Sequence, residues 1–417
     1  MPFILRFVVG IVLVVLIDLY FYQAIALLIA NLSPFKKIVI RNIDWGFTAY
    51  TVVLFLVAML IPFQEWWPFA RIYLFAFAII LLICKLIGST FILIDDLTRL
   101  MILLFNLVFT PATGDGDKVG NLSRLKFLNQ AAVILAAIPF GAFIYGMIKS
   151  GFDYKVRKVR LVLPNLPAAF NGLKIVQLSD IHTGSVVSSA PLEKALRMIQ
   201  EQNADVIFFT GDLVNNITDE AIPYTEIFKQ IKAPMGVYST LGNHDYGDYV
   251  QWPSVEAKQK NLQDLKNLHA EFGWKLLMNE HITLKKGDAE IAVLGVENWG
   301  EAMRFPKYGD LKKAHAGTEN FPVKLLLSHD PSHWDAQIRK LYSDIDVTFS
   351  GHTHGMQFGI EIPGFRWSPS KYIYKQWADL YQEGKQYLYV NRGLGFLGYP
   401  GRVGILPEIT VVELHNA

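Results

Sequence analysis

The chain has 417 residues, of which 39 are basic and 37 acidic, so its net charge at pH 7 is +2. One cysteine excludes a disulfide framework and a cysteine-rich zinc module, and the near-neutral charge argues against a dedicated nucleic-acid-binding protein. The mean hydropathy of +0.27 is too high for a single soluble domain. All ten histidines follow residue 148, which indicates a membrane part followed by a soluble part.

Residues 1–150 are predicted to form a transmembrane region with about four helices. A helix needs about 20 mostly apolar residues to span the bilayer. Residues 97–109 are apolar but short, so we expect them at the interface or against another helix, with a fifth span as the alternative. The stretches predicted to span are 5–30, 46–63, 69–94 and 127–148.

Two charged residues, Asp18 and Lys85, lie well away from the ends of predicted spans. A charge in a membrane helix marks a functional site by default, and an ion path is one interpretation. Each residue is isolated in the sequence, so we favour structural pairing, or snorkelling of Lys85 to the interface. We therefore expect an anchor in the cell membrane rather than a transporter. Basic residues are equally numerous on the two sides of the membrane, so a cytoplasmic soluble domain is only a working hypothesis.

After residue 150 the sequence changes to short β-type runs separated by helical stretches, which is typical of α/β proteins. Residues 151–170, with Pro164 and Pro167, are predicted to connect the membrane region to a domain at 171–417. The strongly apolar runs predicted as strands include 173–178, 205–210, 236–241, 323–328 and 346–350.

Each of these five strands is followed directly by side chains that bind metals. The carboxyl ends of strands form the ligand-binding edge of open α/β sheets, so we expect the five loops to converge. Carboxylates mixed with imidazoles suit Mn, Fe or Zn, and so many ligands indicate two ions about 3.5–4 Å apart. One such cluster is a weak signal, whereas five in succession are a strong one. The residues are Asp180, His182, Asp212, Asn243, His244, Asp245, His329, Asp330, His352 and His354.

The order and spacing of these motifs resemble the five-block signature of the calcineurin-like metallophosphoesterase superfamily over residues 155–417. The C-terminal run Arg392-Gly393-Leu394-Gly395 is similar to a membrane-anchored, mostly bacterial branch, in which glycine usually stands at the position of Met356. The resemblance implies a four-layer α/β/β/α sandwich with two metal ions at its strand ends. The matching blocks are Asp180-x-His182, Gly211-Asp212, Gly242-Asn243-His244-Asp245, His329 and Gly351-His352-Thr353-His354.

The resemblance also implies a role for each site residue. His244 would face the phosphate without binding metal and would assist the leaving oxygen, while Asp245 would orient or cap its loop. Two cations neutralise phosphate oxygens and lower the pKa of a bound water, and an imidazole with an ordinary pKa of about 6.5 suits protonation of a leaving group. One metal would be held by Asp180, His182, Asp212 and His354, and the second by Asp212, Asn243, His329 and His352.

Residues outside these motifs allow more than one interpretation. His333 is a candidate for substrate contact if its loop turns into a helix. Arg402 either binds a phosphate, for which guanidinium is suited, or forms a structural salt bridge. The aromatic-rich segment 359–389 either lines an apolar entrance near the bilayer or packs as a core hairpin. The histidines expected on the surface or in ordinary packing are His269, His281, His315 and His415.

The sequence predicts a membrane-anchored phosphoesterase that hydrolyses a phosphodiester or phosphomonoester with metal-activated water. The predicted spans favour a lipid-linked or membrane-proximal substrate, and no nucleic-acid partner is expected. The alternative is a non-catalytic membrane scaffold on the same fold, which the full ligand set disfavours because function resides in the site. A transporter is disfavoured by the scarcity of intramembrane charges, and a nuclease by the −1 charge balance of the soluble part. The oligomeric state stays open.

Overall fold

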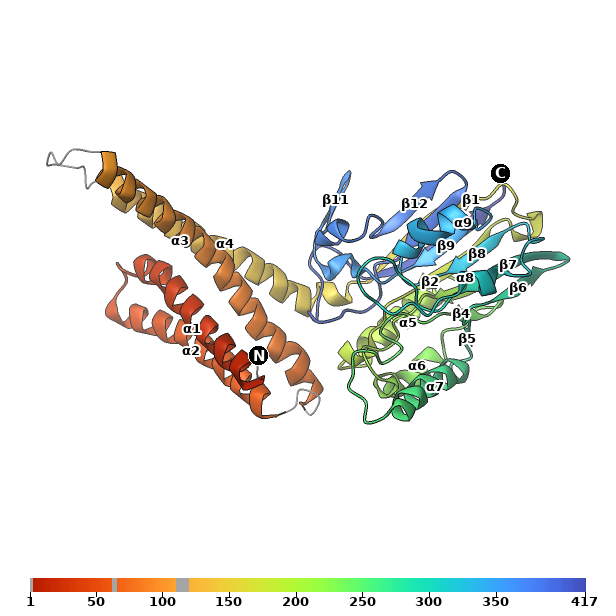
Figure 1. Ribbon diagram of the computed structural model, residues 1–417, viewed down its shortest axis with the longest axis horizontal. Helices are drawn as coiled ribbons and strands as arrows, with labels where there is room; N and C mark the ends of the chain where they lie inside the picture. Colours follow the sequence, from red (N-terminus) through yellow and green to blue (C-terminus); the bar gives the residue numbers. More distant parts are fainter. Residues whose placement is uncertain (1–2, 62–65, 110–119) are drawn as a thin grey trace. The chain divides into compact units, whose positions relative to one another are not determined.

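The computed structural model describes the backbone of residues 3–61, 66–109 and 120–417, and the side chains of residues 8–61, 66–105 and 127–417. The chain divides into two compact units, Met1–Tyr145 and Gly146–Ala417 (Figure 1). Each unit has its own apolar clusters, so the two are described in turn.

The first unit is built from long apolar helices (Figure 1). Within the described residues, four helical segments are long and apolar enough to cross a bilayer: Val8–Leu28, Pro34–Leu60, Ala70–Phe105 and Phe127–Phe152. The helices are α1 (Phe3–Leu28), α2 (Pro34–Leu60), α3 (Phe75–Phe109), which continues a π-helical turn at Ala70–Leu74, and α4 (Gly120–Ile148).

Two of the differences between the helix boundaries and the sequence prediction involve charged segments. Helix α2 begins at Pro34 rather than at residue 46, because proline is favourable at the start of a helix and the basic residues that follow are good helix formers. Residues 97–109 continue α3 without a break instead of forming a separate interfacial segment. Asp95 and Arg99 pair at 2.8 Å along this helix, so the charges that suggested a boundary satisfy each other. Residues 62–63 of the predicted second span lie outside the described residues.

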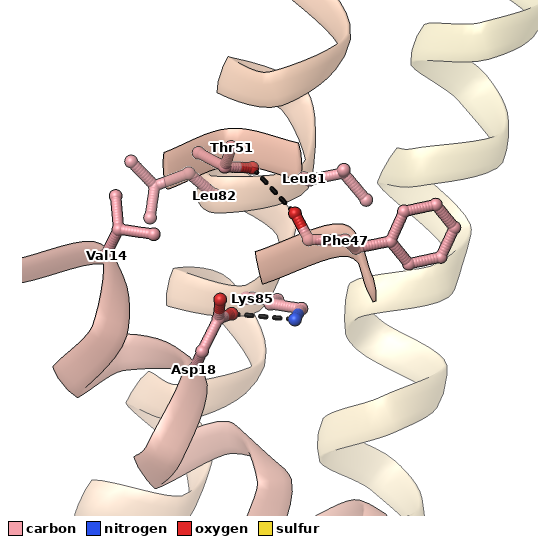
Figure 2. Close-up of a pocket in the computed structure, with 7 residues that line it drawn as sticks. All are labelled: Val14, Asp18, Phe47, Thr51, Leu81, Leu82 and Lys85. Carbon is pink, nitrogen blue, oxygen red and sulfur yellow. Dashed lines mark hydrogen bonds and ion pairs between the residues drawn. The ribbon is translucent and has the colours of Figure 1, made fainter. Parts of the chain in front are cut away.

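Asp18 and Lys85, the charged residues in the middle of predicted spans, pair with each other and with a third residue. The ammonium of Lys85 in α3 lies 2.7 Å from the carboxylate of Asp18 in α1 (Figure 2) and 2.9 Å from that of Asp44 in α2. All three side chains are buried, and Lys85 and Asp18 border a small cavity with Thr51. The structure therefore shows pairing rather than snorkelling. The third partner, Asp44, belongs to the part of α2 that the hydropathy pattern left outside the predicted span.

The second unit contains two six-stranded sheets. In spatial order, the first consists of β1 (Lys155–Val162), β14 (Glu408–His415), β2 (Leu173–Leu178), β3 (Val206–Phe209), β4 (Val237–Ser239) and β5 (Lys275–Leu276). The second consists of β12 (Asp379–Glu383), β13 (Gln386–Val390), β9 (Val347–Ser350), β8 (Lys324–Leu327), β7 (Ala289–Gly295) and β6 (Glu280–Lys286). A separate hairpin is formed by β10 (Ile360–Ile362) and β11 (Phe365–Trp367).

The two sheets pack against each other and are covered by helices on their outer faces (Figure 1). Between the sheets, Phe208 of β3 contacts Phe349 of β9 with ring centroids 5.2 Å apart. This arrangement is the predicted four-layer α/β/β/α sandwich. The first sheet is covered by α5 (Ala190–Gln200), α6 (Thr225–Phe228) and α7 (Val255–Glu271). The second is covered by α8 (Leu311–His315) and by a π-helical turn at Trp334–Ile338 that leads into α9 (Arg339–Leu341).

The segment 151–170 is more than the connector that the sequence suggested. Residues 155–162 form β1, an edge strand that pairs in parallel with β14. Its charged side chains, Arg157, Lys158 and Arg160, obscure an apolar pattern, and such charges are common on edge strands. The partner strand lies at the other end of the chain, so its pairing cannot be recognised locally.

The strands that carry the site motifs are parallel within each sheet. β2, β3 and β4 run parallel to one another in the first sheet, and β8 and β9 do so in the second. The loops after β2 and β9 meet, because the backbone N–H of His352 donates to the carboxylate of Asp180 at 3.0 Å. The fold therefore brings five loops that are distant in sequence to one edge of the sandwich.

Candidate metal centre

The backbone at the strand ends turns sharply to present the predicted ligands. Five of these residues adopt the left-handed region, with φ between 49° and 72°. Such conformations cost energy in residues other than glycine and collect at functional sites. Gly211, with φ of 95°, precedes one of them, and a Cβ there would lie 2.4 Å from the backbone N of Gly242. The five residues are Asp180, His182, Asp212, His352 and His354.

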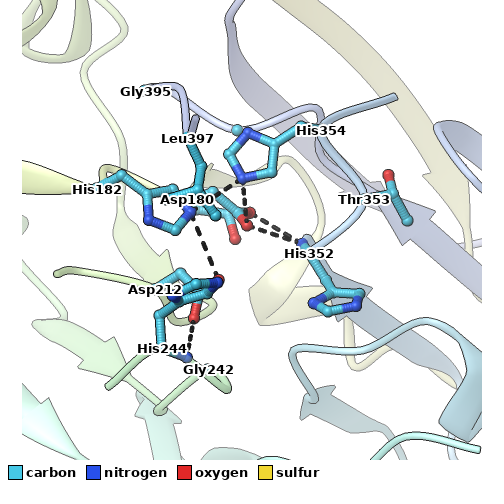
Figure 3. Close-up of polar contacts among 12 residues, drawn as sticks. Asp180, His182, Asp212, Gly242, His244, His352, Thr353, His354, Gly395 and Leu397 are labelled. Carbon is cyan, nitrogen blue, oxygen red and sulfur yellow. Dashed lines mark hydrogen bonds and ion pairs between the residues drawn. The ribbon is translucent and has the colours of Figure 1, made fainter. Parts of the chain in front are cut away.

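The first group of predicted ligands contains Asp180, His182 and His354 (Figure 3). The two Nε2 atoms of the histidines lie 3.0 Å apart, and His354 Nε2 lies 3.2 Å from Asp180 Oδ1. All three side chains are buried. Three ligand atoms from two different loops therefore face one point.

The second group contains Asp212, His329 and His352. His329 Nε2 lies 3.2 Å from His352 Nδ1 and 3.2 Å from Asp212 Oδ2. The same carboxylate oxygen lies 3.5 Å from His182 Nε2 of the first group. Asp212 thus stands between the two groups, where one oxygen can face both metal positions.

The donor set fits divalent metal ions. Two imidazole nitrogens that face each other closely need a cation or a shared proton between them, and both groups contain such a pair. The ring of His329 is oriented by its Nδ1–H, which donates to the carbonyl of Thr210 at 2.7 Å, so that Nε2 faces Asp212 and His352. Among the described residues, Asn243 Oδ1 is buried without a hydrogen-bond donor, as expected of an oxygen reserved for a cation.

Burial and neighbouring charges determine the protonation of this centre. Desolvation lowers the pKa of His182 to about 3, although the Asp212 carboxylate opposes the shift, and it also lowers the pKa of His352. At His329 the lowering effect of burial is outweighed by Asp212, and its pKa rises to about 10. At neutral pH the rings of His182 and His352 are therefore uncharged, whereas a metal ion bound at His329 would displace a proton.

The loop after β4 carries Asn243, His244 and Asp245, each with a different environment. The amide nitrogen of Asn243 donates to Tyr249 Oη at 2.8 Å, and among the described residues no donor reaches its Oδ1. His244 Nδ1–H donates to the carbonyl of Asn215 at 2.7 Å, and its ring is half-buried. The ring centroid of His244 lies 5.1 Å from that of His182. His244 is thus beside the first group without belonging to either.

Asp245 holds the loops rather than facing the centre. Its buried carboxylate accepts backbone N–H groups from Gly242, Asp212, Leu213 and Val214 at 2.8–3.3 Å. These bonds join the loop after β4 to the loop after β3. The loop-capping role expected for Asp245 agrees with these contacts.

The structure adds residues that the sequence pattern did not single out for these roles. Tyr374 Oη lies 2.7 Å from His352 Nε2, and Asp330 Oδ2 lies 3.6 Å from the same nitrogen. Together they orient the His352 ring so that Nδ1 faces His329. Tyr249 does the same for Asn243. All three come from loops or turns, and no spacing in the sequence connects them to the residues that they orient.

Two candidates from the sequence have other roles. The buried guanidinium of Arg402 donates to the carbonyls of Arg392, Gly393 and Gly395, and its Nη2 lies 3.2 Å from His354 Nδ1, so its donors are used within the protein; among the described residues it has no carboxylate partner. His333 is buried, and its Nδ1 contacts Ser328 Oγ at 2.8 Å, so it holds its own loop instead of facing substrate. The remaining histidines lie outside the centre; buried His269, for example, contacts Ser239 Oγ at 3.0 Å.

Comparison with known proteins agrees with this geometry. Residues 1–151 match the family described as probable calcineurin-like phosphoesterase, transmembrane domain, and residues 173–356 match calcineurin-like phosphoesterase. A transmembrane protein with metallophosphoesterase domain from Danio rerio is 30% identical over 319 residues, which cover 72% of this chain and 69% of the relative. The uncharacterized metallophosphoesterase YkuE of Bacillus subtilis is 31% identical over 318 residues, or 71% of this chain and 98% of the relative.

A third relative has a named reaction. The UDP-2,3-diacylglucosamine pyrophosphatase LpxG of Chlamydia muridarum is 29% identical over 289 residues, which cover 58% of this chain and 83% of the relative. The family matches cover both the membrane helices and the ligand-bearing strands. The chain therefore belongs to the calcineurin-like metallophosphoesterases, as a membrane-anchored hydrolase of phosphoester bonds.

Proposed function

We propose that this enzyme hydrolyses a lipid-linked phosphodiester or phosphomonoester at a two-metal centre. The observation that carries the proposal is the position of Asp212, whose Oδ2 faces both buried ligand groups while its Oδ1 accepts the backbone N–H of His244 at 2.9 Å. One residue thereby connects the two metal positions with the histidine beside them.

The proposed ligand sets follow the two groups. When bound, two divalent ions such as Mn, Fe or Zn supply positive charge to the phosphate oxygens and activate a water for attack. Asn243 contributes an uncharged oxygen, which keeps the site cationic enough for an anionic ester. The first set is Asp180, His182, Asp212 and His354, and the second is Asp212, Asn243, His329 and His352.

His244 is the proposed catalytic residue. The carbonyl of Asn215 holds the proton on Nδ1, so Nε2 is the ring nitrogen available to substrate. Because the ring is only half-buried and lies beside the first group, it can reach the departing oxygen of a bound ester. There it stabilises the developing negative charge and supplies a proton.

The proposed substrate is attached to a lipid. The membrane-spanning helices keep the catalytic unit at a bilayer, and the Chlamydia relative acts on a diacylated substrate. The proposal places the catalytic unit on the cytoplasmic side, as a working hypothesis. Protease digestion of sealed vesicles of known orientation tests the side independently of the activity.

The catalytic claim is tested with the full chain in detergent, an aryl phosphodiester and added Mn²⁺. Asp212→Asn should abolish hydrolysis, whereas the matched change Asp219→Asn, on an exposed residue, should retain it. Equal activity of wild type and Asp212→Asn would overturn the proposal. Phosphoesters lost from lipid extracts with wild type, but not with Asp212→Asn, would then identify the substrate.

The scaffold alternative predicts a different result. A non-catalytic protein on this fold has no need of metals, so purified protein would contain far less than one ion per chain. Metal analysis of wild type and Asp212→Asn distinguishes the two, because the enzyme should lose metal when the connecting carboxylate is removed.

A further inference from the structure

The hairpin of β10 and β11 exposes its apolar face and turns its charged face toward the rest of the domain. Antiparallel partners share a face, so the pairs Ile360–Trp367 and Ile362–Phe365 lie on one face and Glu361–Arg366 on the other. The apolar face is the outer one, since Ile362 is 58% exposed and Phe365 53% exposed. A hairpin on the surface of a soluble domain normally turns its polar face to water.

The polar face is held against the domain by ion pairs. Glu361 contacts Arg157 at 2.6 Å and Arg392 at 2.7 Å, and Arg366 contacts Asp379 at 2.7 Å. The Arg392 side chain is fully buried. Because these bonds fix the charged side inward, the outward direction of the apolar side is built into the fold.

The turn that follows β11 also exposes apolar side chains. Tyr372 is 73% exposed and Ile373 is also exposed, and exposed Lys371 and Lys375 flank them. Aromatic, aliphatic and basic side chains in this combination are typical of segments that lie in the interface of a bilayer. We name the residues Ile360, Ile362, Phe365, Tyr372 and Ile373 the hairpin surface.

A chain of contacts within the second unit connects the hairpin to the end of the last membrane helix. The carbonyl of Gly146, in the final turn of α4, accepts the backbone N–H of Arg402 at 3.4 Å, and Gly146 lies within the membrane-compatible helical segment Phe127–Phe152. The next residue, Val403, forms a parallel bridge with Phe358, two residues before β10. Within the second unit, the start of the hairpin is thus connected to the last residues of α4.

The same segment reaches the metal centre. Tyr374, directly after Ile373, contacts His352 at 2.7 Å, and Ser368 at the end of β11 donates to the carbonyl of Gly355 at 2.6 Å. Gly355 follows the predicted ligand His354. An apolar outer surface and a polar site therefore lie on two sides of one short segment.

We propose that the hairpin surface docks into the headgroup–acyl boundary of the bilayer and so holds the metal centre at the level of lipid phosphates. The occupant is the lipid leaflet, because contacts through Phe358, Val403 and Arg402 connect the hairpin to the last turn of α4, and because the hairpin surface carries flanking lysines that match anionic headgroups. The docking does not depend on hydrolysis, and it complements the proposed function by placing the site where lipid-linked esters are.

Fluorescence quenching in proteoliposomes tests the docking. In a full-length Cys84→Ala background, Phe365→Cys is labelled with an NBD fluorophore and reconstituted in phosphatidylcholine–phosphatidylglycerol vesicles. A matched label at Lys385→Cys, in the exposed polar turn of the β12–β13 hairpin, is the control. Lipids with a nitroxide near the headgroup should remove most of the emission at position 365 and little at position 385.

Three results would overturn the inference. Equal quenching at both positions would show that Phe365 does not enter the leaflet. Quenching at position 365 by an aqueous quencher but not by nitroxide lipids would place it in water. In the third case, the emission at position 365 changes with the number of protein molecules per vesicle and shows no quenching by nitroxide lipids. That result would assign the hairpin surface to contact with a second copy of the chain. Failure of the hydrolysis assay would leave the quenching result unaffected.

Discussion

The amide of Asn243 donates a hydrogen bond to the phenolic oxygen of Tyr249 at 2.8 Å, and its own oxygen is left buried without a donor. Tyr249 therefore fixes the amide nitrogen of Asn243 and leaves its oxygen available as the proposed metal ligand. The orienting partners of metal ligands typically contribute 10–100-fold to affinity or activity.

Removing this bond should weaken metal binding without removing a ligand. Tyr249→Phe is expected to raise the Mn²⁺ concentration needed for half-maximal hydrolysis by about 10-fold, with near-normal activity at saturating Mn²⁺. Tyr308→Phe, a change of the same kind at a tyrosine that bonds Asp248, is the control. A Mn²⁺ titration identical to wild type would contradict this role of Tyr249.

Removing the proposed catalytic histidine should lower turnover without lowering metal content. His244→Gln is expected to reduce kcat by about 10²- to 10⁴-fold, the usual contribution of a general acid. Metal analysis of the same sample should match wild type, since His244 belongs to neither ligand group. His415→Gln, near the C-terminus, should leave kcat unchanged. Loss of metal together with activity would instead make His244 part of the metal site.

The membrane unit should depend on the charge of Lys85. Lys85→Met leaves the carboxylates of Asp18 and Asp44 buried without their cation, and breaking a buried ion pair costs about 3–5 kcal/mol. Thermal unfolding of the full chain in detergent should shift to lower temperature. Replacing both aspartates by asparagine as well should recover part of the loss, whereas Lys36→Met, on an exposed residue, should have little effect.

Buried His269 should make the catalytic unit sensitive to acid. Desolvation lowers its pKa in the folded state to about 3, while the unfolded chain has a value of about 6.5. Its contribution to stability is complete above pH 6.5 and falls by up to about 1.4 kcal/mol per pH unit as the pH decreases toward 3. His269→Gln should flatten the dependence of the unfolding temperature on pH between 6 and 4, and parallel curves for the two proteins would contradict this.

Several elements were predictable because their signals are local. The membrane helices follow from long apolar runs, and β2, β3, β4, β8 and β9 follow from short ones that end in ligand-type residues. The start of α2 was predicted too late in the chain, because hydropathy is low in a turn that contains lysines although such a turn can still be helical. Strand β1 was missed since its pattern is charged and its partner β14 is remote.

The sequence by itself determined which chemistry is present, since residue types directly after apolar strands specify the donor atoms of a metal centre. Only the tertiary structure decided which residues meet. It paired Lys85 with Asp44 as well as Asp18, placed Tyr249 on Asn243, and directed Arg402 to backbone carbonyls instead of a phosphate. The physical reason is that donor type is a property of one residue, whereas orientation, burial and pairing arise from contacts between segments that only the packed chain brings together.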